Sequence, residues 1–339
     1  MIGKVEPTES NVWAPLMDAH GRLHTYLRVS LTDRCNFRCL YCMPAEGVEW
    51  KPRAEILSLE EIERLVRVFA RMGIDKVRLT GGEPTVRKGF LGLLKGICAV
   101  EGITKVALTT NATRLAETAP LLKAAGLTGI NISLDSLKRE KFSEITRRDA
   151  LEEVLAGIDA AVRAEIDSIK LNVVVLPGTN DDELVDFVEF VRDRPIQVRF
   201  IEFMPFLGNN WKVERVIGYR EMRERIETKH KLIPMPGEPT DVAKDFRIEG
   251  FLGTVGFVTS VTESFCGGCN RIRLTADGKF KTCLFLPARS SLRDMMRSGA
   301  SDEELATTIR ADLQTKWAGH PPMTQWAQLD NRSMVEIGG

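Results

Sequence analysis

The chain lacks the features that mark membrane and secreted proteins. No run of eighteen apolar residues occurs in its 339 residues, so the sequence predicts no membrane-spanning helix. Its first residues, MIGKVEPTESNVW, contain no apolar stretch of the kind found in a secretory signal. An excess of either charge is missing too, because 47 Lys and Arg balance 47 Asp and Glu. Bulk charge therefore gives no indication of nucleic-acid or membrane binding, and any anion site must be local.

Two common nucleotide-binding motifs are also absent. The P-loop pattern GxxxxGK[ST] does not occur, and no GxGxxG follows a predicted strand. A disulfide framework is excluded as well, because the cysteines are seven in number and six of them fall in two tight groups. Grouped cysteines fit metal binding in a reducing compartment better, so we expect a cytoplasmic protein.

Strand patterns alternate with amphipathic helix patterns through the first two-thirds of the chain. Between the strands lie helical patterns such as SLEEIERLVRVFARMG (58–73), in which Ser58 and Glu61 predict a capping box. Such βα repeats imply parallel strands joined by right-handed crossovers. After residue 205 we expect a helix (218–230), Pro- and Gly-rich turns, short strands and two short helical patterns. The predicted strands of the first part are 26–32, 76–82, 105–111, 129–135, 169–176 and 196–205.

These strands are apolar on one face only, whereas strands of a parallel sheet buried on both faces read as continuous apolar runs. Leu27, Val29 and Leu31 alternate with Arg28, Ser30 and Thr32, and later strands repeat the pattern. Closing such a sheet places a charged lining inside a barrel, and unpaired buried charges cost several kcal/mol. The lining therefore requires a ligand, a cluster or counter-charges. The alternative is an open sheet with one solvated face.

The segment TDRCNFRCLYC (32–42) holds three cysteines, Cys35, Cys39 and Cys42, spaced C-x3-C-x2-C. Thiolates select iron–sulfur clusters or zinc. A structural zinc site takes four ligands, and no histidine follows closely, since the four are His20, His24, His230 and His320. Three cysteines leave one metal position open, which suits a catalytic cluster. Zinc and three coincidental core cysteines are the alternatives.

The segment FCGGCNRIRLTADGKFKTCLF (265–285) provides a second incomplete triad, Cys266, Cys269 and Cys283. Taken alone, it fits a zinc knuckle that lacks a ligand or a cluster with an open iron. The seventh cysteine, Cys98, lies in an apolar helix pattern and is expected to pack in the core.

Cations accompany both triads. Arg271 and Arg273 follow Cys269 at a spacing of two, which places both guanidiniums on one face of an extended segment. Together with Arg28, Arg78 and Lys170 they predict a cluster of five cations that a polyphosphate would neutralise. The alternative for each of these residues is a solvated surface position.

The first triad, with Tyr41 before its last cysteine, resembles the radical S-adenosylmethionine superfamily. In that superfamily three cysteines hold a [4Fe–4S] cluster whose fourth iron chelates S-adenosylmethionine. LTGGEP (79–84) resembles its glycine-rich loop, with Gly82 and Glu83 as candidates to meet the methionine moiety. The two triads, CxxCxRxR and the terminal Gly-Gly together resemble the GTP 3′,8-cyclase family of molybdenum cofactor biosynthesis, over about residues 20 to 339.

The resemblance implies an α/β fold, an incomplete (β/α)6 TIM-type barrel with a C-terminal α+β extension that carries a second [4Fe–4S] cluster. The expected divisions are an N-terminal segment (1–25), the partial barrel with the first cluster (26–210) and a C-terminal domain (211–339). One departure from the family is Ala112, which stands after TTN where the family usually has glycine; we interpret it as a minor turn variation.

The resemblance also implies site residues. Cys35, Cys39 and Cys42 would hold the first cluster, and Cys266, Cys269 and Cys283 the second, whose open iron binds the guanine end. Residues at the S-adenosylmethionine positions are Tyr41, Gly82, Ser133 and Met204. Residues at the GTP positions are Arg28, Arg78, Thr109, Lys170, Arg271 and Arg273. The catalytic set implied is Arg28, Arg271, Arg273 and the tail residues Gly338 and Gly339.

The implied reaction converts GTP to (8S)-3′,8-cyclo-7,8-dihydroguanosine 5′-triphosphate after a 5′-deoxyadenosyl radical removes the 3′ hydrogen of the ribose. Expected partners are GTP, a flavodoxin-type reductant, the next enzyme (cyclic pyranopterin monophosphate synthase) and a second copy in a homodimer, with no nucleic acid and no membrane. The alternatives are a radical S-adenosylmethionine enzyme with an auxiliary cluster acting on a peptide or RNA, and a non-catalytic zinc module.

Overall fold

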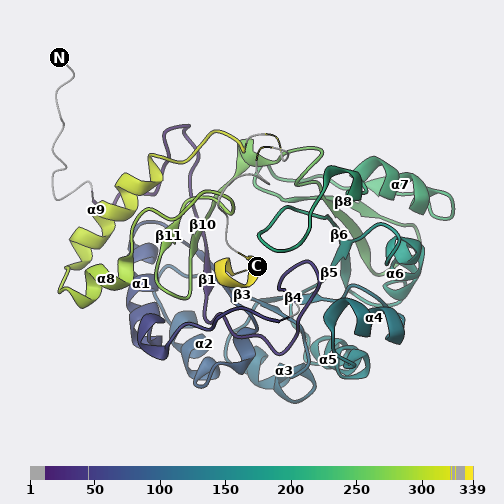
Figure 1. Ribbon diagram of the computed structural model, residues 1–339, viewed down its shortest axis with the longest axis horizontal. Coiled ribbons are helices and arrows are strands. Elements are labelled where there is room, and N and C mark those ends of the chain that lie inside the picture. The colour runs from purple at the N-terminus through teal and green to yellow at the C-terminus, as the bar shows by residue number, and fades with distance from the viewer. Residues whose placement is uncertain (1–11, 45, 321, 323–324, 326–332, 339) are drawn as a thin grey trace.

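The computed structural model describes residues 12–44, 46–320, 322, 325 and 333–338. Within them a single curved sheet of eleven strands surrounds a central space, and most helices lie outside it (Figure 1). The strand order is β11-β10-β1-β2-β3-β4-β5-β6-β9-β8-β7, so the two end strands are not paired and the barrel is incomplete. The predicted α/β fold with a parallel sheet is confirmed at this level.

All six strands predicted in the first two-thirds of the chain form, and they are neighbours in chain order. Each pairs in parallel with the next, which the βα repeats require. The strands end up to three residues earlier than the sequence patterns do. They are β1 (Tyr26–Ser30), β2 (Lys76–Thr80), β3 (Lys105–Thr110), β4 (Gly129–Ser133), β5 (Ser168–Val175) and β6 (Gln197–Glu202).

Strands from the last third of the chain extend this same sheet at both ends. β9 (Thr254–Val258) pairs in parallel with β6, and β10 (Arg271–Leu274) pairs in parallel with β1. The sequence predicted short strands here but not that they would join the barrel. Their pairing brings the second cysteine segment beside the first. The remaining strands pair antiparallel: β7 (Ile233–Pro234), β8 (Ala243–Arg247) and β11 (Phe280–Lys281).

The helices that follow β1 to β6 cover the outer side of the sheet (Figure 1). Helix α1 begins at the predicted capping box, in which Ser58 accepts from the Glu61 backbone and Glu61 accepts from that of Ser58. These helices are α1 (Leu59–Arg71), α2 (Phe90–Cys98), α3 (Leu115–Ala124), α4 (Arg139–Thr146), α5 (Leu151–Arg163), α6 (Leu184–Phe190) and α7 (Tyr219–Glu227). The later helices are α8 (Leu292–Arg297), α9 (Asp302–Leu313) and α11 (Met334–Ile337).

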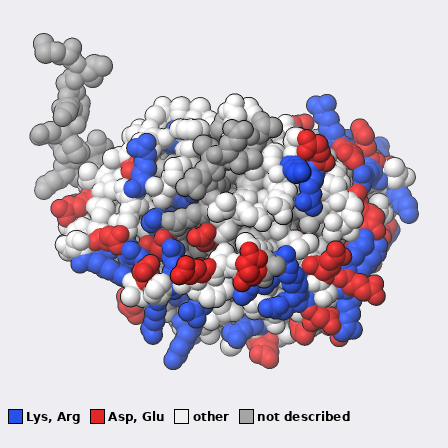
Figure 2. Space-filling view, in the orientation of Figure 1, with Lys and Arg blue, Asp and Glu red and all other residues white. Residues whose placement is uncertain are grey.

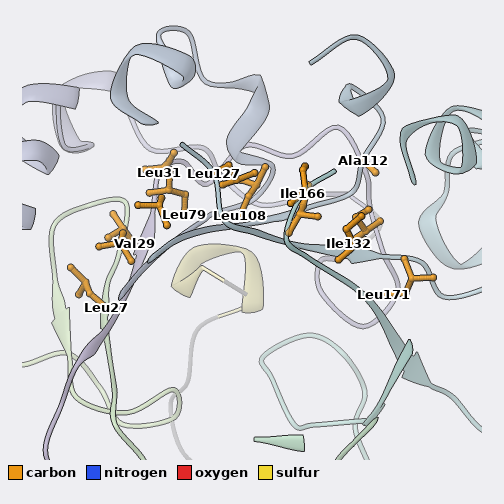
Figure 3. Packing of buried hydrophobic residues seen from close by; sticks show 14 of the residues in the cluster. Leu27, Val29, Leu31, Leu79, Leu108, Ala112, Leu127, Ile132, Ile166 and Leu171 are labelled. Atoms are coloured by element: carbon orange, nitrogen blue, oxygen red, sulfur yellow. The ribbon is translucent and has the colours of Figure 1, made fainter. Parts of the chain in front are cut away.

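The core lies between the sheet and these helices. Leu27, Val29 and Leu31 of the first strand segment are fully buried, as are Leu79, Leu108, Ile132 and Leu171. Figure 3 shows them on the convex side of the strands, with the short helix α11 on the opposite, concave side. The alternation predicted from the sequence is therefore confirmed: the apolar face packs under helices, and the polar face points into the barrel.

Charges of both signs intermingle on the outer surface. Figure 2 shows Lys and Arg beside Asp and Glu over the helices at the lower rim, without a broad patch of one sign on this face. Several of these residues form exposed ion pairs, such as Arg139 with Asp149. Among the helices that the structure describes, none is long and apolar enough to cross a membrane.

Candidate functional site

One cavity inside the barrel collects the predicted site residues other than Gly338 and Gly339. Its volume is about 430 Å³, and both cysteine triads line it. Every residue predicted for S-adenosylmethionine or GTP also lines it, which places residues from opposite ends of the chain in one space. These lining residues are Arg28, Tyr41, Arg78, Gly82, Thr109, Ser133, Lys170, Met204, Arg271 and Arg273.

The first triad lies in the loop that leaves β1. Backbone bonds tie this loop to the end of α4, since Arg38 N donates to Thr146 O and Leu40 N donates to Ile145 O, both at 2.9 Å. The Arg147 side chain donates to Arg38 O at 2.8 Å. The loop is thus held in place by the main chain, while its three thiols remain partly exposed to the cavity.

Burial dominates the electrostatics of the first triad. It raises the pKa of the Cys35 thiol to about 11 and that of Cys42 to about 12, with neighbouring carboxylates and thiols adding to the effect. In the superfamily that the triad resembles, the ligands are thiolates, so binding a cationic iron cluster would release these protons. These surroundings therefore oppose the negative charge of the thiolates, which the positive charge of an iron–sulfur core would compensate.

The glycine-rich loop packs directly against the segment that precedes Cys35. Gly82 N donates to Thr32 O at 2.7 Å, and Glu83 N donates to Arg34 O at 2.8 Å. A Cβ at Gly82 would stand 2.3 Å from Arg34 O, so only glycine fits. This contact aligns the loop after β2 with the cysteine loop after β1. Glu83 is buried and accepts from Thr110 Oγ1 and Asn111 N.

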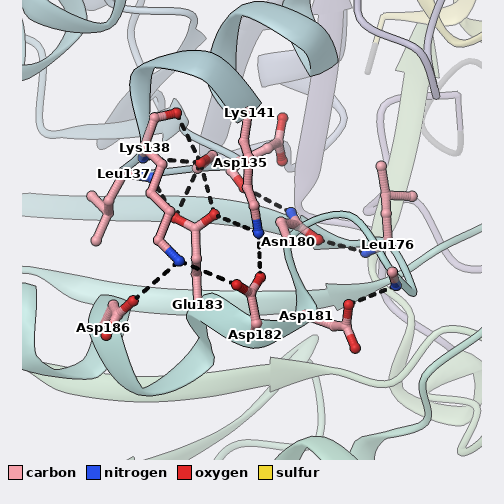
Figure 4. A network of polar contacts seen from close by, with 12 residues as sticks. Asp135, Leu137, Lys138, Lys141, Leu176, Asn180, Asp181, Asp182, Glu183 and Asp186 are labelled. Atoms are coloured by element: carbon pink, nitrogen blue, oxygen red, sulfur yellow. Dashed lines mark hydrogen bonds and ion pairs between the residues drawn. The ribbon is translucent and has the colours of Figure 1, made fainter.

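A buried hydrogen-bond chain fixes Tyr41. Its hydroxyl donates to Asp135 Oδ2 at 2.8 Å, and Val174 N donates to Asp135 Oδ1 at the same distance. Asn180 Nδ2 donates to Asp135 O at 2.7 Å, which links this pair to the network around Glu183 (Figure 4). Burial raises the pKa of Asp135 to about 6. Asp135 lines the cavity but was not predicted as a site residue.

The second triad stands on the other side of β1. Cys266 and Cys269 bracket a short 3-10 turn, η6 (Cys266–Gly268), and Cys283 follows β11. Burial alone would raise the pKa of the Cys269 thiol, but Arg271 and Lys316 outweigh it and lower the pKa to about 6. The two triads thus differ in surroundings, with carboxylates near the first and cations near the second.

The strand registers align the predicted cations in rows. Arg28 on β1 faces Arg78 on β2 and Arg273 on β10, and Tyr26 faces Lys76 and Arg271. Two guanidinium nitrogens, Arg271 Nη2 and Arg273 Nη1, are buried without a hydrogen-bond partner among the described residues. Buried donors of this kind are rare unless a ligand satisfies them. The arrangement is suited to a polyanion.

Two further cations complete the lining. Lys76 and Arg199 line the cavity, and Arg199 donates to Asn172 Oδ1 at 2.7 Å. Sequence reasoning did not select them as site residues. Lys76 stands on the predicted polar face of its strand, and Arg199 would have followed had the alternation been extended to 196–205. Burial, together with Arg199, lowers the pKa of Lys170 to about 8.

Tyr26 is enclosed by these cations. Its hydroxyl accepts from Arg78 Nε, and Lys76 Nζ lies 4.6 Å from the centre of its ring. Burial alone would raise the pKa of Tyr26, but the neighbouring cations lower it to about 7. Sequence reasoning did not select this phenol as a site residue.

The chain's last helix lies inside the barrel (Figure 1). After α11, Gly338 adopts φ +76°, and a Cβ there would stand 2.7 Å from both Ser30 Cβ and Thr80 Oγ1. Gly338 therefore packs against the carboxyl ends of β1 and β2. Gly339 lies outside the described residues.

The donor sets fit the clusters that the sequence implies. In the described part of the chain, no three His, Cys, Asp or Glu side chains converge on a single metal ion. A four-iron cluster takes each thiolate on a different iron, so its cysteines need not converge on one point. Two sets of three free thiols line the cavity, and each set contains no fourth cysteine.

Comparison with known proteins agrees with this geometry. Residues 29–191 match the Radical SAM superfamily, and residues 196–322 match Molybdenum Cofactor Synthesis C. The crystal structure of SuiB from Streptococcus suis has a TM-score of 0.60 at 14% identity, covering 91% of this chain and 69% of that one. This likeness shows the fold alone.

Curated relatives are much closer in sequence. The mitochondrial GTP 3′,8-cyclase of Arabidopsis thaliana is 50% identical, over 96% of this chain and 83% of that protein. The GTP 3′,8-cyclase of Syntrophomonas wolfei is 43% identical, over 96% of this chain and 100% of that protein. Molybdenum cofactor biosynthesis protein 1 of Mus musculus is 46% identical, and this chain spans only 51% of its length. The chain belongs to the GTP 3′,8-cyclase family of the radical SAM superfamily.

Proposed function

We propose that this chain is a radical S-adenosylmethionine enzyme that converts GTP to (8S)-3′,8-cyclo-7,8-dihydroguanosine 5′-triphosphate, the first step of molybdenum cofactor biosynthesis. The observation that carries the proposal is the single cavity of about 430 Å³ that both cysteine triads and seven cations line. An enzyme that joins two parts of one nucleotide needs the radical source and the nucleotide's anchors in one space. The names of the relatives agree with this reaction.

Cys35, Cys39 and Cys42 would hold the first [4Fe–4S] cluster, which supplies the electron for cleavage of S-adenosylmethionine. Around this triad, Gly82 would leave room for the methionine moiety, and Tyr41, Ser133 and Met204 would contact the rest of the cosubstrate. Tyr41 is suited to a fixed contact because Asp135 orients its hydroxyl. Val174 and Asn180 in turn donate hydrogen bonds to Asp135, so the position of Tyr41 is fixed by a buried network.

The cations would bind the triphosphate. Arg28, Arg78, Lys170, Arg271 and Arg273, with Thr109, form the predicted set, and Lys76 and Arg199 extend it along the same wall. Charge-assisted hydrogen bonds from guanidiniums are the strong kind, and the unsatisfied nitrogens of Arg271 and Arg273 are available for them. Binding a polyanion would offset the mutual repulsion of these buried cations. Because the repulsion between these cations destabilises the fold, their clustering has no purely structural explanation.

Cys266, Cys269 and Cys283 would hold a second [4Fe–4S] cluster, whose fourth iron binds the guanine end. The proposal includes the division of the chain after residues 25 and 210, in which the C-terminal part (211–339) would hold the second cluster. Gly338 and Gly339 would reach the reacting centre, because Gly338 already packs against β1 and β2 inside the barrel. The reductant, the hand-over to the next enzyme and a homodimer remain predictions.

The proposal is tested by incubating anaerobically reconstituted protein with S-adenosylmethionine, a reductant and GTP, followed by mass spectrometry. We expect GTP-dependent 5′-deoxyadenosine together with a GTP isomer of unchanged mass. Cys35→Ala protein should form neither product. Cys98→Ala is the matched control and should form both, because Cys98 lies on α2 and does not line the cavity.

The other outcomes separate the parts of the proposal. 5′-Deoxyadenosine without a GTP isomer would retain the radical chemistry and refute GTP as substrate, in favour of an auxiliary-cluster enzyme that acts on another substrate. If fully loaded protein forms neither 5′-deoxyadenosine nor a GTP isomer, the whole assignment is refuted.

A further inference from the structure

A buried lysine stands beside the second triad. Lys316 follows α9, and 4% of its surface is exposed. Its Nζ donates to Cys269 Sγ at 3.4 Å and to Arg271 O at 2.8 Å. A lysine is almost never buried to this extent unless an opposite charge compensates it. Its two acceptors here are a cysteine sulfur and a backbone carbonyl.

Among the residues that the structure describes, no acidic side chain provides that compensation. No ion pair joins Lys316 to a carboxylate in that part of the chain, and Asp18, the acidic residue near the neighbouring Arg22, pairs with Arg22 at 2.7 Å. Burial alone would raise the pKa of Asp18, but hydrogen bonds from His24 and Arg22 hold it well below its usual value. Asp18 is therefore fully charged, and Arg22 matches it. The groups that remain to compensate the charge of Lys316 are the sulfur atoms of Cys269 and Cys283.

The lysine is held at the triad by an N-terminal clasp, which consists of Asp18, His20 and Arg22. The ring of His20 bonds Lys316 O at 3.0 Å through Nε2. Arg22 donates to Cys266 O at 2.8 Å and to Trp317 O at 2.6 Å. One guanidinium thus joins the cysteine segment to the lysine segment, although Arg22 lies 244 positions from Cys266 and 295 from Trp317 in the sequence. An accidental surface lysine would have no reason to be fixed in this way.

We propose that Lys316 is the counter-charge of the second iron–sulfur cluster and that it stabilises the cluster's reduced form, so that the cluster accepts an electron more readily. A [4Fe–4S] cluster with three thiolates is negatively charged, and reduction adds to that charge. Net charge and hydrogen bonds to the sulfurs are among the factors that set cluster potentials. Groups just outside the ligands tune a metal site in the same way. This inference rests on the proposed second cluster.

The test is a redox titration of the loaded protein monitored by electron paramagnetic resonance. The signal that persists in Cys35→Ala protein is assigned to the second cluster. We expect Lys316→Met to lower the ratio of reduced to oxidised second cluster about tenfold at a fixed potential, a shift of about 59 mV to more negative values for one electron. Lys316→Arg keeps the charge and should titrate close to the parent. Lys229→Met, which removes an exposed lysine after α7, should also match the parent.

Several outcomes would overturn the inference. An unchanged potential in loaded Lys316→Met protein would show that the lysine does not act on the cluster. If Lys316→Met protein cannot hold the second cluster, the cluster content of Lys316→Arg protein decides whether the charge is required. A loaded Lys316→Arg protein supports a requirement for charge, and loss in both variants refutes it. Iron analysis of the parent protein separates this result from failure of the proposed function, because a parent with only one cluster would refute the second cluster itself.

Discussion

At the residue scale, the barrel lining is a set of positive charges that are already buried. Lys170 and Arg199 share one part of the wall, and Arg28, Arg78 and Arg273 are register neighbours on another. Alternation along single strands was enough to predict most of these residues. Alternation also places Tyr26 and Asp135 on the polar faces of their predicted strands, but it could not reveal their roles, because these depend on neighbours that distant segments supply.

The paired arginines after Cys269 should contribute strongly to GTP binding. We expect Arg271→Ala and Arg273→Ala each to cost about 1.5–3 kcal/mol, a rise of roughly tenfold to a hundredfold in the Kd for GTP. Equilibrium binding under anaerobic conditions measures this effect. The control is Arg220→Ala, because the Arg220 side chain is 86% exposed. Unchanged affinity in the Arg271→Ala/Arg273→Ala double variant would refute the phosphate assignment.

Lys170 should make GTP binding depend on pH. Its pKa is lowered to about 8, so in the free protein the side chain loses its proton as pH rises through that value. A neutral amine attracts phosphate less, and affinity should therefore fall from pH 7 to pH 9. Lys170→Arg should remove the part of this fall that Lys170 causes, since arginine stays charged. Lys170→Met should keep only the dependence that GTP and the other titrating groups of the wall, such as Tyr26, contribute. An equal fall in all three proteins would contradict the prediction.

At the element scale, the turns that follow the strands position the first cysteine triad and the glycine-rich loop. The backbone geometry of these turns was harder to predict than the types of residue in them. The capping box of α1 and the glycine loop followed from sequence. The turn after β3 did not, because Ala112 was interpreted as a minor variation and in fact adopts φ +65°. An alanine in this region carries strain that glycine would not. The family's usual glycine at this position therefore has a physical reason.

Replacing Ala112 by glycine should relieve that strain. The left-handed conformation costs alanine about 1–2 kcal/mol, and glycine loses about 0.5–1 kcal/mol through the entropy of the unfolded chain. Ala112→Gly also removes a fully buried methyl group, whose burial contributes about 0.8 kcal/mol, so the free energy of unfolding should stay within about 1 kcal/mol of the parent value. Ala124→Gly at the exposed end of α3 is the control and should lower it by about 0.5–1 kcal/mol. Thermal unfolding compares the two, and a loss well above about 1 kcal/mol in Ala112→Gly would contradict the account.

The end of the chain should be sensitive to a single methyl group. Gly338→Ala would place a Cβ 2.7 Å from Ser30 and Thr80, so the tail must leave its position beside β1 and β2. We expect a loss of cyclisation with little change in unfolding temperature. Gly299→Ala is the matched control, since Gly299 also has positive φ but no atom within 4 Å of an added Cβ. Equal activity losses in the two variants would indicate backbone strain instead of a positional role for the tail.

At the scale of the whole molecule, one sheet unites the two cysteine segments. The βα repeats predicted β1 to β6 and their order. Nothing local in the sequence indicated that β10 would pair with β1, or β9 with β6, because strand pairing between distant segments has no periodic signature. This pairing turns two separate motifs into one cavity, and a GTP molecule anchored on its cations would lie between two cluster sites.

That central claim is tested most directly with GTP that carries deuterium at the 3′ carbon. If the nucleotide lies with its ribose toward the first triad, the 5′-deoxyadenosine formed with S-adenosylmethionine should contain that deuterium, as mass spectrometry would detect. 5′-Deoxyadenosine without deuterium, formed alongside turnover of the labelled GTP, would contradict the account, because the nucleotide would then not present its 3′ carbon to the first cluster site.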